Sequence, residues 1–276
     1  MKTLQLLTPP LAKLDVVSTA SKALPQTKPI HPKLAGIYNR HLFSLHAKVA
    51  AGSIFDGPVT VLREWDIVRG ELRLKLQTSS YIPMTATRLT YVEALRDGLI
   101  AAADVPMIPS RFGACLCACV VVVSSDSQVL TMRRAASMSN GGLAALALGE
   151  VLEPSDFDGR AQPLHHAGAR AVREELGVAL TSDQVAQFIR PLYLTRGLEC
   201  GSWVFVIAVD LRGAGDDFSA ERILTQAKSA KDAWEAESRD AIPFTRPSLV
   251  AYLQANQGRT CLWAEELVEI LAQDVL

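Results

Sequence analysis

The 276-residue chain lacks an excess of charge of either sign. It carries 28 Lys plus Arg against 29 Asp plus Glu, which gives a formal net charge of −1. Proteins that bind nucleic acid usually present a basic surface. The longest apolar run, residues 114–123, is also far shorter than the roughly 20 residues that a membrane-spanning helix needs. We therefore expect neither nucleic acid nor a membrane as a partner.

The chain also lacks the cysteine spacing of common metal sites. It has five cysteines and five histidines but no Cys-x-x-Cys pair. Cys115, Cys117 and Cys119 alternate along a predicted strand, so we expect their side chains to share one face and to pack as small apolar groups. The odd number of cysteines, together with the lack of a credible signal peptide, predicts a cytoplasmic protein.

The first part of the chain is poor in regular patterning. Five prolines fall within residues 1–36, which predicts an extended arm. Residues 54–76 predict two short strands separated by a turn at Arg69-Gly70, and residues 91–103 predict a helix. We therefore expect an N-terminal arm and a small α+β extension over residues 1–110.

The second part, residues 111–276, alternates between predicted strands and helices. A polar loop is expected over residues 149–166. Strands are expected at residues 111–123, 128–133, 188–194 and 202–211, and helices at residues 167–176, 219–236 and near the C-terminus. A mixed sheet flanked by helices is the economical arrangement of these elements, so the expected fold class is α/β.

Residues 170–179 concentrate charge in an unusual place. Glu174 and Glu175 come just before Gly177, which is expected to end the helix. The helix dipole disfavours carboxylates at that end of a helix. A bound Mg²⁺ or Mn²⁺ would stabilise them, because these cations bind clustered carboxylate oxygens. An exposed pair between Arg170 and Glu174 at i,i+4 is the alternative.

This helix and the loop before it resemble the signature of the Nudix hydrolase superfamily, G-x5-E-x7-R-E-U-x-E-E-x-G-U, where U is aliphatic. Gly149 resembles the glycine that leads the loop, and Asp156 lies near the position of the first glutamate, in a loop several residues longer than the signature. The resemblance covers residues 111–255 and implies an α/β/α sandwich with a mixed sheet. The second half of the signature matches at Arg170, Val172, Glu174, Glu175, Gly177 and Val178.

Ala171 makes the signature degenerate, because it stands where the family has a glutamate. In the family that glutamate lies one helical turn before the residue matched by Glu175, and the two carboxylates hold the catalytic metal together. Alanine cannot bind a metal ion, so its presence is expected to weaken both metal affinity and turnover.

The resemblance implies roles for several residues. Arg170 would brace the loop through Glu174, while Glu174 and Glu175 would face the metal as catalytic residues. Glu150, Glu153 and Asp156 lie on the preceding loop and could replace the missing carboxylate, with Glu153 and Asp156 as the candidate metal ligands. Solvated loop carboxylates are the alternative interpretation of these last two residues.

Two later segments could complete the site. Arg196, Glu199 and Trp203 surround a turn between two predicted strands, where substrate specificity often resides in this family, although an ordinary hairpin is equally consistent. Glu235 and Glu237 lie where many members place a late acidic residue, but a solvated helix end is the favoured interpretation.

Arg133 and Arg134 close a predicted strand and could contact phosphate, although a surface charge pair is favoured. Gly141-Gly142 is not a phosphate-binding P-loop, because no Gly-Lys-Ser/Thr pattern follows it.

The resemblance implies a metal-dependent hydrolase, using Mg²⁺ or Mn²⁺, that cleaves the diphosphate of a nucleoside diphosphate linked to another moiety. The alternative is a catalytically impaired Nudix-fold domain that binds a nucleotide-like ligand in a regulatory role. Ala171 supports this alternative, and Glu174-Glu175 supports the enzyme. Residues 54–87 also resemble the N-terminal part of Nudix proteins that hydrolyse UDP-sugars. We also expect that the chain could form a homodimer.

Overall fold

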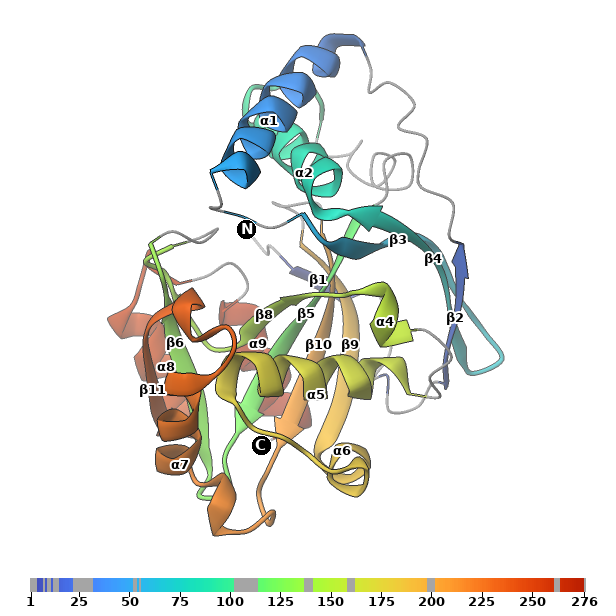
Figure 1. The fold of residues 1–276 in the computed structure, drawn as a ribbon. Helices are drawn as coiled ribbons and strands as arrows, with labels where there is room; N and C mark the ends of the chain where they lie inside the picture. Colours follow the sequence, from blue (N-terminus) through green and yellow to red (C-terminus); the bar gives the residue numbers. More distant parts are fainter. Residues whose placement is uncertain are drawn as a thin grey trace.

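The strands of the protein form one mixed sheet in the computed structural model (Figure 1). The structure describes residues 4–6, 8, 11, 15–21, 32–51, 54, 56–101, 114–136, 141–157, 162–197, 202–260 and 264–275. The strands are β1 (Leu4–Leu6), β2 (Asp15–Ser21), β3 (Pro58–Val68), β4 (Glu71–Ser80), β5 (Ala114–Val123), β6 (Gln128–Arg134), β7 (Ala144–Ala145), β8 (Leu148–Val151), β9 (Ile189–Gly197), β10 (Ser202–Asp210) and β11 (Ala236–Pro243).

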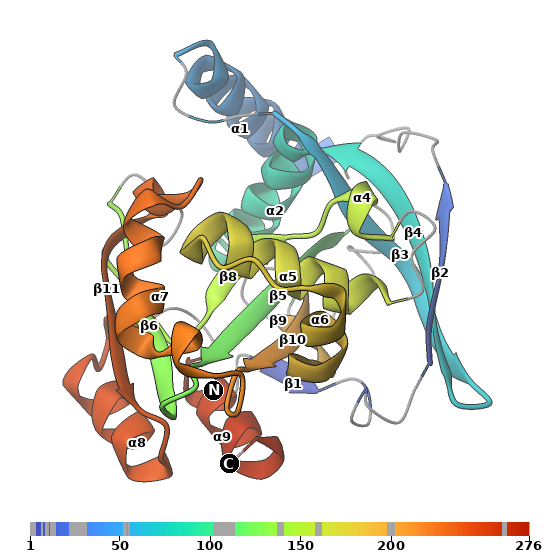
Figure 2. The same ribbon diagram turned by 60° about the horizontal axis from the view of Figure 1, so that its bottom comes forward.

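Helices cover both faces of the sheet (Figure 2). They are α1 (Pro32–Ala50), α2 (Tyr81–Arg96), α4 (Pro154–Phe157), α5 (Pro163–Leu176), α6 (Ser182–Phe188), α7 (Ala220–Gln226), α8 (Arg246–Ala255) and α9 (Ala264–Asp274). No helix in the described ranges is both long and apolar enough to cross a membrane.

The centre of the sheet is the parallel pair β5 and β10, and β9 runs antiparallel to β10. From β5 the order continues through β3 and β4 to β2, while β6 pairs β5, β7 and β11, and β8 pairs β5. Parallel and antiparallel neighbours therefore occur in one sheet. This confirms the predicted α/β class with a mixed sheet.

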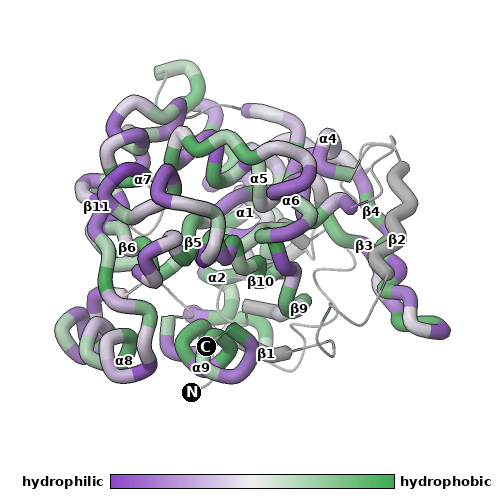
Figure 3. The backbone as a smooth tube through the Cα atoms, turned by 90° about the horizontal axis from the view of Figure 1, so that it is seen from below, coloured by the Kyte–Doolittle hydropathy of each residue, from purple (hydrophilic) through white to green (hydrophobic). Residues whose placement is uncertain are grey.

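Strand β5 is buried on both faces, which explains its continuous apolar run. Leu116, Ala118, Val120 and Val122 pack in one core cluster with the apolar residues of α5. Cys119, Val121 and Val123 pack in the opposite cluster, with residues of α8 and α9. Figure 3 shows the corresponding hydrophobic colouring in β10 and on part of α9.

The N-terminal hairpin continues the central sheet. β3 pairs with β4, and the turn at Arg69-Gly70 has positive φ angles of 53° and 83° at its two central residues, as a tight hairpin turn requires. β3 then pairs with β5 through Val61↔Cys115 and Leu62↔Ala114. Helices α1 and α2 lie together beyond this end of the sheet (Figure 1).

Several predicted boundaries in the first part are wrong. The arm contains β1, which pairs with β9, and β2, which runs parallel to β4. Its last proline, Pro32, starts α1, because proline suits the first position of a helix. The helix predicted at residues 91–103 is α2, which starts ten residues earlier at Tyr81 and contains Pro83 in its first turn, where the missing N–H has no helical partner to lose.

The second part follows the prediction more closely, with three exceptions. Helix α6 was not predicted. The expected loop at residues 149–166 contains β8, α4 and the start of α5 at Pro163. The helix predicted over residues 219–236 is wrong beyond α7, where 3₁₀ turns lead into β11. These turns bring the end of the segment back against β6, with which β11 pairs.

Candidate functional site

Helix α5 carries most of the predicted site residues on one rigid element. Pro163 occupies its first turn, and Gly177 ends it with a left-handed φ of 72°. The Gly177 N–H donates to Arg173 O at 3.0 Å, as expected of a glycine C-cap. The helix lies close against β9 and β10, because a Cβ on Gly168 would come within 3.2 Å of Ile189 and Ile207 side-chain atoms. This close packing fixes the acidic end of α5 relative to the sheet.

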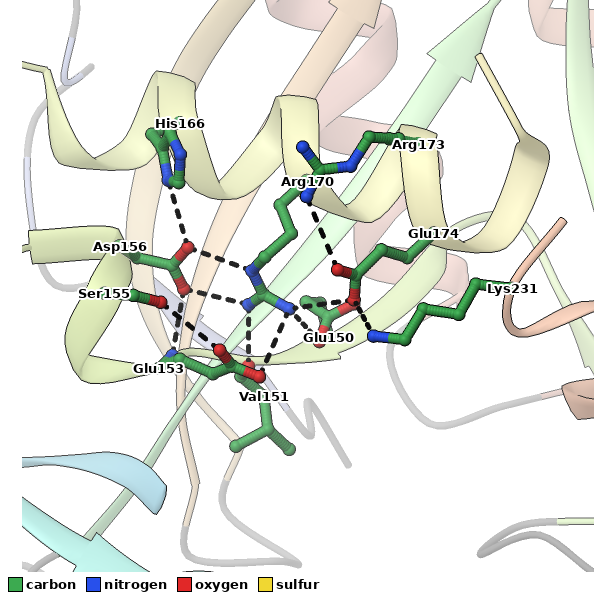
Figure 4. A network of polar contacts seen from close by, with 10 residues as sticks. All are labelled: Glu150, Val151, Glu153, Ser155, Asp156, His166, Arg170, Arg173, Glu174 and Lys231. Atoms are coloured by element: carbon green, nitrogen blue, oxygen red, sulfur yellow. Dashed lines mark hydrogen bonds and ion pairs between the residues drawn. The ribbon is translucent and has the colours of Figure 1, made fainter. Parts of the chain in front are cut away.

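Arg170 ties α5 to the β8–α4 segment (Figure 4). Its side chain is 5% exposed, and its Nε and Nη2 donate to the two oxygens of Asp156 at 3.0 and 2.8 Å. Nη1 donates to Glu150 at 2.9 Å, and Nη2 also donates to Val151 O at 3.0 Å. Such a forked, charge-assisted pairing holds the segment in one geometry.

Asp156 is fully buried, and both of its oxygens accept hydrogen bonds from Arg170. Its Oδ2 also accepts from the Glu153 N–H at 2.9 Å, and its Oδ1 lies 3.3 Å from His166 Nδ1. These contacts favour a bracing role, and the predicted metal ligation by Asp156 stays a prediction.

Glu174 lies at the outer side of the site, where cations surround it (Figure 4). Its carboxylate lies 3.1 Å from Lys231 Nζ, 3.6 Å from Arg170 Nη1 and 3.5 Å from Arg173 Nη2. The contact with Arg170 is the i,i+4 pair expected from the sequence, but the Glu174 side chain is only 14% exposed. Glu174 is therefore a charge-neutralised residue at the edge of the site.

Glu175 has the most unusual environment in the described chain. It is 2% exposed, and its Oε2 has no hydrogen-bond partner in the described residues. Burial raises the pKa of this carboxyl well above its ordinary value, and the charges of Glu150 and Glu235 raise it further against the opposing effect of Arg134 and Arg239. A buried carboxylate without a partner is costly, which marks this position as a place where a cation or proton is needed.

Glu150, Glu175 and Glu235 form what we call the acidic cluster. They come from β8, α5 and the 3₁₀ turn Ala233–Glu235 and interact with one another electrostatically. Burial raises the pKa of Glu150 to about 7, and burial also raises the pKa of Glu235. Among the residues that the structure describes, no three acidic, histidine or cysteine side chains are placed to hold a metal ion by themselves.

Two arginines lie beside the acidic cluster. Arg134 Nη2, at the end of β6, is 3.5 Å from Glu235 Oε2, and its side chain is 13% exposed. Arg239 on β11 donates from Nη1 to Ala233 O at 3.1 Å and from Nη2 to Asp232 O at 3.4 Å. The Nε of each is buried without a hydrogen-bond partner in the described part of the chain. Both guanidinium groups therefore have one buried, unpartnered donor, and their charges act on Glu175.

The remaining predicted residues are a partly exposed neighbour of Arg170, a packed tryptophan, and two residues whose side chains are not described. The Glu153 side chain is 44% exposed and lies 3.8 Å from Arg170. Trp203 packs edge to face on Trp65, with ring centroids 6.4 Å apart. Glu199 lies outside the described residues, and of Arg196 only its backbone in β9 is described.

Ala171 is fully buried in the apolar core between α5 and the sheet. Among the described residues, no three acidic, histidine or cysteine side chains replace it in a complete metal site. The acidic cluster instead brings in Glu150 and Glu235 from other elements.

Sequence reasoning undervalued three residues of the site. The solvated helix end predicted for Glu235 is wrong, because this residue lies in a 3₁₀ turn facing Arg134. The surface charge pair favoured for Arg134 is also wrong, since its side chain is largely buried. No sequence motif marks Arg239. Its place in the site follows only from the pairing of β11 with β6, which brings Arg239 opposite Met132.

No protein-family model and no curated protein matches the chain. Solved structures do resemble it. A bifunctional NMN adenylyltransferase/ADP ribose pyrophosphatase from Francisella tularensis has 14% identity and a TM-score of 0.38, covering 68% of this chain and 48% of that chain. DR0079 from Deinococcus radiodurans has 17% identity and a TM-score of 0.38, covering 56% of this chain and 81% of that one.

A third similar structure is Tm1382, a candidate Nudix hydrolase, with 12% identity and a TM-score of 0.40, covering 79% of this chain and 99% of that one. The match spans about half the length of the Francisella protein. At these identities and TM-scores the similarities assign no activity to this chain.

Proposed function

We propose that the chain is a divalent-cation-dependent pyrophosphohydrolase that cleaves a nucleoside diphosphate linked to another moiety. The observation that carries the proposal is Glu175, a buried carboxylate whose Oε2 has no hydrogen-bond partner in the described residues. Burial raises its pKa, and two further carboxylates, Glu150 and Glu235, raise it further. Three acidic groups in one partly buried place repel one another, and a divalent cation relieves that repulsion.

The donor set fits Mg²⁺ or Mn²⁺ in its chemistry, because carboxylate oxygens are the ligands that hard cations prefer. Mg²⁺ commonly keeps several waters and binds through one or two carboxylates together with substrate phosphates. That mode suits a cluster in which Glu175 and Glu150 are the main donors. When bound, the cation would neutralise diphosphate charge and activate a water for attack on phosphorus.

Arg134 and Arg239 would bind the diphosphate oxygens. A guanidinium presents several donors in a fixed plane, which matches phosphate geometry. Their positive charges beside Glu175 support this role. Arg170 would act indirectly by holding Glu150 in place. Glu174, which is neutralised by Lys231, would set the outer edge of the site.

The test is hydrolysis of nucleoside diphosphate derivatives with Mg²⁺ and with Mn²⁺, measured as release of mononucleotide. Glu175→Gln is expected to lower turnover on the order of 10²-fold or more, because it removes a charge at the reacting centre while keeping the side-chain volume. Glu237→Gln is the matched control, since Glu237 is an exposed glutamate on β11, two residues beyond Glu235. Equal loss in both variants, or none in a folded Glu175→Gln protein, would refute the assignment.

A second function is favoured by one observation. Ala171 is buried in the apolar core at the position where the signature has a metal ligand. A domain that binds a nucleotide-like ligand without cleaving it would tolerate this loss. Calorimetric binding of ADP with Mg²⁺, without any product after prolonged incubation, would support this function over hydrolysis.

A further inference from the structure

Trp234 is an aromatic side chain at the surface, 59% exposed, within the 3₁₀ turn Ala233–Glu235. Trp65 and Trp203, by contrast, pack on each other. Exposure alone would not single Trp234 out, because isolated apolar residues are common on protein surfaces. Its backbone anchoring and its neighbours distinguish it.

The backbone on both sides of Trp234 is held by hydrogen bonds. The Asp232 N–H donates to Glu174 O at 2.9 Å, and the Ala135 N–H donates to Glu235 O at 2.8 Å. Arg239 Nη1 donates to Ala233 O at 3.1 Å. The turn is therefore anchored to α5, to the end of β6 and to β11. A rigidly presented aromatic loses little conformational entropy when a ligand packs on it.

The neighbours of Trp234 belong to the proposed diphosphate site. Glu235, the next residue, is a member of the acidic cluster and lies 3.5 Å from Arg134. Lys231, three residues earlier, lies 3.1 Å from Glu174. Consecutive Cα atoms are about 3.8 Å apart, so the indole starts from the rim of the charged site. A ligand with a diphosphate at the acidic cluster would carry its next group across this rim.

We propose that Trp234 is the stacking platform for the nucleobase of the bound nucleoside diphosphate. This rests on the proposed function and extends it by naming the residue that recognises the base. Stacking on an indole accepts every base, because each has a flat π face. Trp234 therefore selects for a nucleoside over a bare diphosphate without discriminating among bases.

Equilibrium binding of two probes to the full chain with Mg²⁺ tests the proposal. ADP carries a base, and inorganic pyrophosphate does not. Trp234→Ala is expected to weaken ADP binding on the order of tenfold and to leave pyrophosphate binding unchanged. Trp234→Phe is expected to retain most of the ADP affinity, because it keeps a ring. The wild-type indole emission is expected to be quenched by ADP, and Trp234→Phe is expected to remove most of that quenching.

Phe43→Ala is the control, because Phe43 is an exposed aromatic, 76% exposed, on α1. It should change neither affinity. Unchanged ADP binding in Trp234→Ala, or an equal loss for both probes, overturns the role of Trp234 while leaving the phosphate site in place. If the wild-type protein binds neither probe, the proposed function itself fails, and this second outcome is distinct from the first.

Discussion

At the scale of single residues, the adjacent glutamates Glu174 and Glu175 of α5 lie in very different electrostatic environments. Glu174 is neutralised by cations on three sides, whereas the adjacent Glu175 faces other carboxylates in a buried position. The sequence shows two identical residues side by side. Their difference arises because successive helical residues point about 100° apart, so Glu174 shares the helix face of Arg170, whereas Glu175 lies on a more deeply buried face.

Glu150 is expected to make stability depend on pH. Burial raises its pKa from 4.5 to about 7 in the folded protein. The unfolded chain therefore releases this proton first as pH rises, and the folded state loses stability from about pH 4.5 until about pH 7. Above that range no further loss comes from this group. The total is at most about 3 kcal/mol, from 1.36 kcal/mol per pKa unit.

Glu150→Gln is expected to remove this loss, because an amide does not titrate. Urea unfolding of both proteins without divalent cation, from pH 4 to pH 8, measures the difference. Relative to the variant, the wild type should become less stable as pH rises. A stability difference that stays constant over this range would show that the carboxyl has an ordinary pKa.

At the scale of secondary-structure elements, the end of α5 depends on Gly177. Its φ of 72° is strained for any other residue, and an added Cβ would lie 3.2 Å from Gln226 O. Gly177→Ala is expected to cost about 1 kcal/mol for the backbone conformation and more for the contact with Gln226. Thermal or urea unfolding measures the loss.

Gly98→Ala is the matched comparison, since Gly98 has a similar φ of 67° and nothing within 4 Å of the added Cβ. Gly98→Ala should therefore lower the free energy of unfolding only by the amount due to the backbone conformation. If the two variants are equally stable, the contact at Gln226 relaxes without cost, and the end of α5 is less tightly packed than the structure indicates.

The sequence predicted the central elements well and the site only in part. The apolar run of β5 and the alternating polar and apolar residues of β4 match the burial of their side chains. Those strands were therefore predicted at nearly their observed positions. The 3₁₀ turns before β11 have no periodic signal, and Glu235 was therefore assigned to a helix end. Arg239 joins the site only through long-range pairing of β11 with β6, which local pattern cannot reveal.

At the scale of the whole molecule, few residue pairs in the described part of the chain join the N-terminal hairpin to the centre of the sheet. Among the described residues β3 and β5 share the pairs Val61↔Cys115 and Leu62↔Ala114, whereas β5 and β10 are paired along nearly their whole length. Local opening is easier where fewer backbone pairs must break. The hairpin and the helices packed on it are therefore expected to open before the central strands.

Hydrogen–deuterium exchange measured by mass spectrometry tests this order. Peptides from β2 and from the outer half of the β3–β4 hairpin are expected to exchange at lower free energy than peptides from β5 and β10. Equal protection in both regions would mean that the side-chain packing of Leu72, Leu74 and Leu76 in the main core couples the hairpin fully to the sheet.

The pairing of β1 with β9 has a consequence for synthesis on the ribosome. Leu4 pairs with Gly197, and the Leu194 N–H donates to Thr8 Oγ1 at 3.1 Å, so β1 is made long before β9, the strand with which it pairs. During that delay β1 has no partner in the part of the sheet that the structure describes, and closing so long a loop is slow. The segment around β1 is thus within reach of a chaperone or a protease until β9 has been made.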